Sequence, residues 1–190
     1  MNRLAQDSIM LTLNNSVPQI ECCFPLPNRA VFDVDDSQFQ AVIDTPFSRL
    51  GIRCHDGKLC NISFLSRTTP LKQPETDEVV EVVYQLECYF DNPKWVFDLP
   101  LTLAGTPFQQ SVWQAMRLIP VGETRSYGQI ASLLKSSPRA VGGACRVNPC
   151  PIVVPCHRIV AANGLGGFDG QREGEKMVIK HGLLSYEGAL

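Results

Sequence analysis

The sequence predicts an α+β protein with a mixed N-terminal half and a mainly helical C-terminal half. Short β-rich stretches dominate the first half, and two helix-capping patterns mark the second. Residues 93–107 hold three prolines and a glycine, which is typical of a connection between domains. We therefore expect one domain over residues 1–95 and another over residues 100–190.

The N-terminal half has few distinctive signals. Residues 40–43, 61–64 and 79–84 are β-rich and are separated by Pro, Asp and Gly clusters. Residues 79–90 also mix apolar and acidic side chains and could instead continue as a helix. We expect a small α+β domain here, and nothing in it indicates catalysis.

The C-terminal half opens with two helix starts of the same kind. Thr106 can cap a helix whose first turn holds Pro107, and Gln109 completes a capping box. Ser126 and Gln129 repeat the capping box and open a second helix. Apolar residues then follow at helical spacing in both segments.

A third helix is predicted over residues 139–146, opened by Ser137-Pro138 and separated from the second by a short polar turn. Two short helices across such a turn match a helix-turn-helix, although many helical hairpins look the same. Small residues make one smooth face of this third helix: Ala140, Gly143 and Ala144. Such a face suits tight helix packing or a narrow groove of DNA equally well.

Charge is distributed unevenly along the chain. The formal net charge is −2, but residues 1–100 carry 8 Lys and Arg against 14 Asp and Glu, whereas residues 101–190 carry 9 against 5. A basic half beside an acidic half points to an anionic partner on one face, with chance unevenness as the plain alternative.

Cysteine use and hydropathy indicate the compartment. The chain has eight cysteines, no clear signal peptide and no apolar run long enough to span a membrane, so we expect reduced thiols in a cytoplasmic protein. Cys54-His55, Cys60 and Cys22-Cys23 could form a zinc site, but reduced small apolar residues are the simpler interpretation.

The strongest chemical signal is Cys156-His157-Arg158, which follows the apolar run of residues 152–155. We expect that run to be a buried extended segment. Cationic neighbours lower a thiol pKa, and the thiolate is the nucleophile. A lone Cys-His pair could equally be a buried cysteine with an incidental histidine, so the surrounding sequence decides.

Residues 155–160, Pro-Cys-His-Arg-Ile-Val, closely resemble the active-site motif of the O6-alkylguanine-DNA alkyltransferase family. The resemblance continues over about residues 100–190. Further matches, in family order, are Phe108-Gln109, Val112-Trp113, Ile119-Pro120, Ser126-Tyr127, Ala140-Val141-Gly142, Asn148-Pro149, Leu183-Leu184 and Glu187-Gly188.

This resemblance implies direct-reversal DNA repair, in which an alkyl group passes irreversibly from O6-alkylguanine, and from O4-alkylthymine, to the protein. Cys156 matches the alkyl acceptor, and each molecule would act once. His157 matches a general base acting through a water, and Glu187 the carboxylate that orients it. Asn148 matches the residue that steadies the active-site turn. No cofactor motif appears, and no metal is implied in the site.

The resemblance also implies a substrate pocket. Tyr127 matches the hydroxyl that donates to the leaving guanine. The backbone carbonyls of Cys156 and Ile159 would accept from its amino group. Phe168 and Asp169 occupy the pocket loop, where the backbone N–H of Asp169 can reach O6.

Fold and partner follow from the same resemblance. The N-terminal domain would be ribonuclease-H-like, and the helix-turn-helix would bind double-stranded DNA through its minor groove as a monomer. Arg139 matches the arginine that fills the base stack after the damaged nucleotide flips out. Ala140, Gly143 and Ala144 would lie against the DNA.

This sequence departs from the family pattern in three places. The stretch between Tyr127 and Arg139 is about two residues shorter than usual. Phe168-Asp169 stand where the family has Tyr-Ser, which brings a carboxylate toward a leaving anion; we expect it to turn to solvent or to pair with a base such as Arg172. Residues 171–175 look like an insertion before the last helix.

Three other functions compete. A non-enzymatic sensor of alkylated bases with the same fold would lack the acceptor cysteine, which is present here as Cys156. A helix-turn-helix transcriptional regulator would need base-reading side chains that the small-residue helix does not offer. A cysteine hydrolase would need an oxyanion hole, for which the sequence gives no signature.

Overall fold

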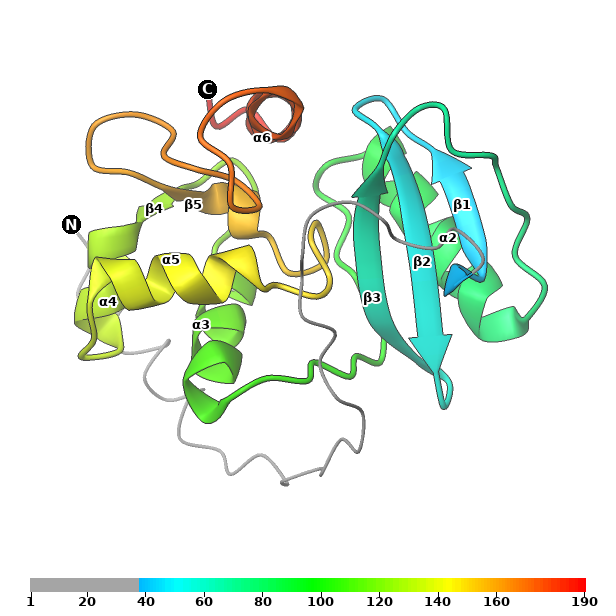
Figure 1. Cartoon of the computed structure of the whole chain (residues 1–190), viewed down its shortest axis with the longest axis horizontal. Coiled ribbons are helices and arrows are strands. Elements are labelled where there is room, and N and C mark those ends of the chain that lie inside the picture. The colour runs from blue at the N-terminus through cyan, green and yellow to red at the C-terminus, as the bar shows by residue number, and fades with distance from the viewer. Residues whose placement is uncertain (1–37) are drawn as a thin grey trace.

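The computed structural model describes residues 38–190, which form a mixed α/β structure of short helices and two small sheets (Figure 1). The first sheet is antiparallel in the order β1-β2-β3, built from Ala41–Asp44, Arg49–His55 and Lys58–Leu65. Helix α2, Asp77–Asp91, packs on this sheet and buries apolar residues at helical spacing.

The N-terminal half differs from the sequence prediction at two elements. Residues 79–84 are helical, so the strand interpretation is wrong and the helix alternative is confirmed. Their apolar residues Val79, Val82 and Val83 recur at helical rather than alternating spacing. Strand β2 is central in the sheet but was not predicted from the sequence, because it mixes arginines with a glycine and ends on Cys-His.

Three helices follow the connecting segment: α3 (Pro107–Arg117), α4 (Tyr127–Leu133) and α5 (Pro138–Arg146). Both predicted capping boxes are confirmed, with Thr106 and Ser126 each accepting from the backbone N–H three residues on. The side chain of Ser137 caps α5 by accepting from Ala140. Helices α4 and α5 pack on each other across residues 134–137.

The C-terminal part of the chain returns to these helices. A 3-10 turn, η2 (Cys156–Arg158), leads into β5 (Ile159–Val160), which pairs in parallel with β4 (Arg125–Ser126). Helix α6, Glu175–Tyr186, then packs against η2. Every helix in this part of the chain is too short or too polar to pass through a lipid bilayer.

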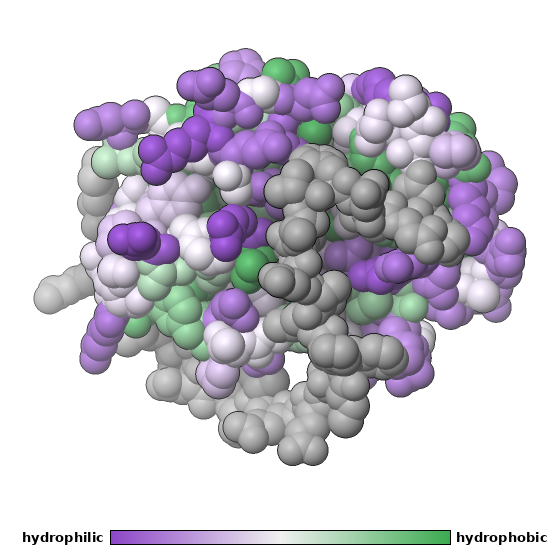
Figure 2. All heavy atoms as spheres, viewed as in Figure 1, coloured by the Kyte–Doolittle hydropathy of each residue, from purple (hydrophilic) through white to green (hydrophobic). Residues whose placement is uncertain are grey.

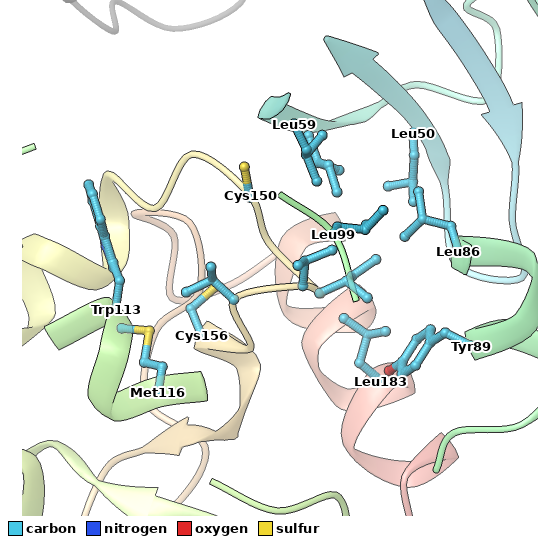
Figure 3. Close-up of a cluster of buried hydrophobic side chains, with 14 of the residues drawn as sticks. Leu50, Leu59, Leu86, Tyr89, Leu99, Trp113, Met116, Cys150, Cys156 and Leu183 are labelled. Carbon is cyan, nitrogen blue, oxygen red and sulfur yellow. The ribbon is translucent and has the colours of Figure 1, made fainter. Parts of the chain in front are cut away.

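One continuous core joins the two halves. Figure 3 shows Leu50, Leu59 and Leu86 of the N-terminal half in the same cluster as Trp113, Met116 and Cys156. Backbone hydrogen bonds cross the junction as well, because Ile62 N–H donates to the carbonyl of Pro149 at 2.8 Å. The turn that precedes Cys156 is therefore attached to β3.

The segment before Cys156 is a tight turn rather than the extended strand that the sequence suggested. Val154 N–H donates to the carbonyl of Cys150 at 2.8 Å, and Ile152 has a φ of 75°. A β-branched residue rarely adopts this left-handed conformation, which costs on the order of 1–3 kcal/mol. The buried apolar run thus closes a loop within the core.

We predict that Ser137→Ala lowers the free energy of unfolding by about 1 kcal/mol, because the first turn of α5 loses its side-chain cap. Urea denaturation measures the change. Ser136→Ala, at the neighbouring exposed position, is the matched control. Equal losses in the two variants would show that the Ser137 cap contributes nothing to stability.

Candidate functional site

Cys156 lies at the first position of η2 and is 7% exposed. Asn148 holds the preceding turn at both ends: its Nδ2 donates to the carbonyl of Val154 at 2.7 Å, and its Oδ1 accepts from Cys150 N–H at 3.1 Å. Asn148 is itself buried, so these bonds replace the water that it loses. The arrangement fits the steadying role expected for Asn148.

The thiol of Cys156 is neutral at rest. Burial raises its pKa to about 11, because a thiolate is poorly solvated in an apolar site. A hydrogen bond from Asn148 and the ammonium of Lys180 act in the opposite direction, whereas the carboxylate of Asp169 raises the pKa further. A nucleophilic role for this sulfur would therefore require the thiol to lose its proton first.

His157 is fully buried and is oriented by a carboxylate. Its Nε2 lies 2.9 Å from Oε1 of Glu187, at the C-terminal end of α6. Burial lowers the pKa of His157, so the ring is neutral near pH 7. Its Nδ1 is buried and has no hydrogen-bond partner among the described residues. That nitrogen is the one left to accept a proton.

Glu187 is the centre of a buried charge network. Arg158 binds it in a bidentate manner, with Nε donating to Oε2 and Nη2 to Oε1, both at 2.8 Å. Burial alone would raise the pKa of Glu187, but the hydrogen bonds from His157 and Arg158 outweigh it and lower the pKa to about 2. The carboxylate therefore stays ionised.

Two members of this network were not identified from the sequence. The first is Arg158, which the sequence indicated only as a cation near Cys156 and not as a partner of Glu187. The second is Tyr89 of α2, whose hydroxyl donates to Oε1 of Glu187 at 2.8 Å. Tyr89 is 98 residues away in sequence, so no local pattern could have revealed it. The N-terminal half thus reaches the site, and Figure 3 shows Tyr89 beside Leu183 of α6.

Tyr127, the first residue of α4, lies over the loop that follows β5. Its hydroxyl donates to the carbonyl of Gly167 at 3.2 Å. Burial raises the pKa of Tyr127 well above its usual range, so the hydroxyl keeps its proton. A Cβ built on Gly166 would come within 3.0 Å of the ring, whereas one built on Gly142 of α5 would meet it at 3.8 Å. Glycine at position 166 therefore leaves room for the Tyr127 ring.

Lys180 of α6 holds the same loop from the other side. Its fully buried ammonium donates to the carbonyls of Ile159, Leu165 and Gly167 at 2.6, 2.6 and 3.0 Å. Burial lowers its pKa to about 8. One side chain thus gathers three backbone carbonyls around the segment after Cys156. No role was predicted for Lys180 from the sequence.

The loop ends in a two-residue hairpin turn. Phe168 and Gln171 exchange two backbone hydrogen bonds, and Asp169 and Gly170 both have positive φ values, 47° and 80°. Asp-Gly is a favoured pair for such a turn. Residues 172–174 connect this hairpin to the start of α6, and Glu187 at the end of that helix reaches His157.

The Asp169 carboxylate makes an ion pair with Lys176, at 3.1 Å, rather than turning freely to solvent. The sequence had suggested solvent or a base such as Arg172. The base that pairs with Asp169 is Lys176, four residues beyond Arg172. It lies in the first turn of α6, which places it next to the hairpin.

Helix α5 exposes only part of the face that was predicted to lie against DNA. Arg139 and Gly143 are exposed and Ala140 is partly exposed, but Ala144 is 2% exposed and its carbonyl accepts from Trp113 Nε1 at 3.0 Å. The prediction that Ala144 faces outward is therefore wrong, because this residue packs on α3. In Figure 2, the surface over α4 and α5 is mostly pale, with separate strongly hydrophilic side chains.

The zinc hypothesis gains no support from residues 38–190, where no three His, Cys, Asp or Glu side chains are grouped to hold a metal. Within the described residues, Cys54 and Cys60 are not joined in a disulfide. Cys22 and Cys23 lie outside the described residues. The chemistry available at the site is that of a buried thiol beside a neutral imidazole, with a protonated phenol and ordered backbone groups close by.

Comparison with known proteins relates these features to a family. Residues 107–189 match the family model described as "6-O-methylguanine DNA methyltransferase, DNA binding domain". The methylated-DNA–protein-cysteine methyltransferase of Mycobacterium leprae is 42% identical over 135 residues, which cover 67% of this chain and 82% of that protein. The constitutive enzyme of that name from Bacillus subtilis is 47% identical over 116 residues, covering 60% and 68%.

A solved structure shares the fold. The crystal structure of Mycobacterium tuberculosis OGT in complex with DNA is similar with a TM-score of 0.66 and 40% sequence identity. The match covers 78% of this chain and 91% of that one. It therefore extends beyond the C-terminal half into the N-terminal sheet.

We predict that the free energy of unfolding falls more steeply between pH 4.5 and about 2 in the parent than in Glu187→Gln. The folded state holds the pKa of Glu187 below its unfolded value, so its stabilisation is present above pH 4.5 and is lost as pH falls toward 2. The difference should be on the order of 2–3 kcal/mol.

Denaturant unfolding at a series of pH values measures this difference. Glu175→Gln, at the exposed first position of α6, is the matched control. Identical pH dependence in the parent and Glu187→Gln would mean that the buried carboxylate is not held ionised by its partners.

Proposed function

This chain belongs to the methylated-DNA–protein-cysteine methyltransferase family, and we propose that it repairs DNA by moving an alkyl group from O6-alkylguanine onto the sulfur of its own Cys156. The observation that carries the proposal is the buried Cys156 beside a neutral His157 whose Nδ1 is free to accept a proton. The identity of the relatives supports the reaction class.

The first step is removal of the thiol proton. Neutral His157 accepts this proton on Nδ1, through a water. Its Nε2–H stays hydrogen-bonded to the carboxylate of Glu187. The imidazolium formed is stabilised by the adjacent carboxylate, whose low pKa prevents it from taking the proton itself. The thiolate exists only as the reaction proceeds, which protects a buried sulfur from other electrophiles.

The second step is a single displacement. The sulfur electron pair forms a bond to the alkyl carbon as the bond from that carbon to O6 breaks. The electron pair of the broken bond stays on guanine, which leaves as an anion and takes up one proton. The products are a thioether on Cys156 and unmodified guanine, with no net oxidation or reduction. Because a thioether is stable, each molecule reacts once.

Groups around the pocket favour this displacement. Tyr127 keeps its proton and can donate to the purine as negative charge develops on it. The backbone N–H of Asp169 serves O6 beside Phe168, and the carbonyls of Cys156 and Ile159 accept from the guanine amino group. The Ile159 carbonyl already accepts from Lys180 and has a second lone pair for the base.

DNA binding involves the C-terminal domain, residues 100–190, with α4 and α5 as a helix-turn-helix. The exposed Arg139, Ala140 and Gly143 lie on the side of α5 that enters the minor groove, and Arg139 replaces the flipped nucleotide in the base stack. Flipping is required because Cys156 is buried and O6 in a stacked duplex is inaccessible to it. The family models and the DNA complex of a relative support DNA as the partner.

The remaining parts of the proposal concern the N-terminal domain and the substrate range. The proposal assigns residues 1–95 to a ribonuclease-H-like domain, and the sheet β1-β2-β3 and α2 lie within that range. O4-alkylthymine is a second substrate, because it presents the same alkyl–oxygen bond. The protein acts on double-stranded DNA as a monomer.

We predict that Cys156→Ser abolishes transfer and leaves DNA binding intact, because a serine hydroxyl is a far weaker nucleophile at neutral pH. Peptide mass mapping after incubation with O6-methylguanine duplex DNA should place one methyl group on the Cys156 peptide of the parent. Cys88→Ser, in α2, is the control. A methyl group found mainly on Cys145 or Cys150 would overturn the assignment.

We predict that Arg139→Ala slows repair of duplex DNA by roughly tenfold and changes the reaction with free O6-benzylguanine by less than about twofold. Base flipping needs the arginine, and a free base does not need flipping. Single-turnover kinetics on both substrates measures this, with Arg117→Ala at the end of α3 as the control. Equal slowing on the two substrates would assign Arg139 to the pocket or the fold.

A further inference from the structure

The Asp169 carboxylate presents an electrostatic difficulty for the proposed reaction. It raises the pKa of the Cys156 thiol, and it lies in the loop next to the leaving oxygen, where the family has serine. An uncompensated negative charge there would disfavour both the thiolate and the guanine anion. Something in this chain must offset that charge.

Lys176 contacts the carboxylate and the N-terminal sheet together. Its ammonium lies 3.1 Å from Oδ2 of Asp169 and donates to the carbonyl of Phe64, in β3, at 3.3 Å. The same ammonium lies 5.3 Å from the centroid of the Phe64 ring. The Lys176 side chain is 11% exposed and that of Asp169 is 30% exposed, so solvent screens the ion pair only in part.

The hairpin is fixed to the same strand by an aromatic pair. The ring of Phe168 is buried, and its centroid is 5.6 Å from that of Phe64. The adjacent hairpin residues Phe168 and Asp169 therefore join this loop to Phe64 and Lys176.

We propose that Lys176 is a positioning residue that neutralises Asp169 and anchors the pocket hairpin to β3, so that a carboxylate at position 169 is compatible with alkyl transfer. It acts through Asp169 and does not touch the substrate. The proposal rests on Cys156 being the acceptor.

Other charged and titratable groups also surround the Cys156 thiol. His157 is adjacent in η2, Lys180 approaches from α6, and Cys145 of α5 and Tyr127 of α4 interact with the same thiol. A test of the proposal must leave these groups unchanged. Substituting Lys176 and Asp169, separately and together, does so.

The experiment is a double-mutant cycle of Lys176→Met and Asp169→Asn. The first readout is the rate of Cys156 alkylation by iodoacetamide across roughly pH 6 to 9, resolved by peptide mass mapping. We expect K176M to slow this reaction roughly three- to tenfold when residue 169 is Asp, and less than about twofold in the D169N background. This readout needs no DNA and so does not depend on the proposed repair activity.

The second readout is single-turnover methyl transfer from O6-methylguanine duplex DNA, for which we expect the same dependence on residue 169. Lys176→Arg keeps the charge and should restore both rates, and Lys58→Met at the β2–β3 turn is the control. Equal slowing by K176M in both backgrounds, or none in either, would overturn the proposal. Coupling in the iodoacetamide reaction without any methyl transfer by the parent would instead overturn the repair function.

Discussion

The buried carboxylate of Glu187 is the interaction on which the site depends. A buried charge without partners is costly, and here it is matched by Arg158, His157 and Tyr89. These partners come from η2 and α2, and Arg158 also donates to the carbonyl of Ile119 after α3. One acidic side chain at the end of α6 therefore fixes how four parts of the chain meet.

The partners of the buried Glu187 carboxylate also bear on the protonation states of Cys156 and His157. Burial lowers the pKa of His157 more than Glu187 raises it, and Arg158 lowers it further, so Glu187 orients the imidazole without bringing its pKa above the usual value. The histidine thus remains a neutral base in a site where the thiol is also neutral. Burial disfavours the charged forms of both Cys156 and His157. In the proposed reaction, the proton passes from the thiol to the imidazole as the sulfur electron pair moves toward the alkyl carbon of the substrate.

Much of the site could be predicted from the sequence because it is locally encoded. The capping boxes at Thr106 and Ser126 and the motif around Cys156 are contiguous patterns whose physical meaning does not depend on the rest of the fold. Tyr89 could not be found in this way, since its role arises only when α2 packs against α6. The ion pair of Asp169 with Lys176 could not be predicted either, because sequence spacing does not specify how residues 171–175 turn back toward the hairpin. The outward side of α5 was misjudged at Ala144, because small residues suit helix packing and DNA contact equally.

The parallel pairing of β4 with β5 has a consequence for how the pocket can vary. Arg125 is in register with Ile159, and Ser126 with Val160, so the backbone just before Tyr127 is joined to the backbone just after Cys156. The span between the phenol and the Ile159 carbonyl is therefore set by main-chain atoms that every amino acid shares. Substitutions can change the side chains around Cys156, but this main-chain link between Tyr127 and Ile159 does not depend on them.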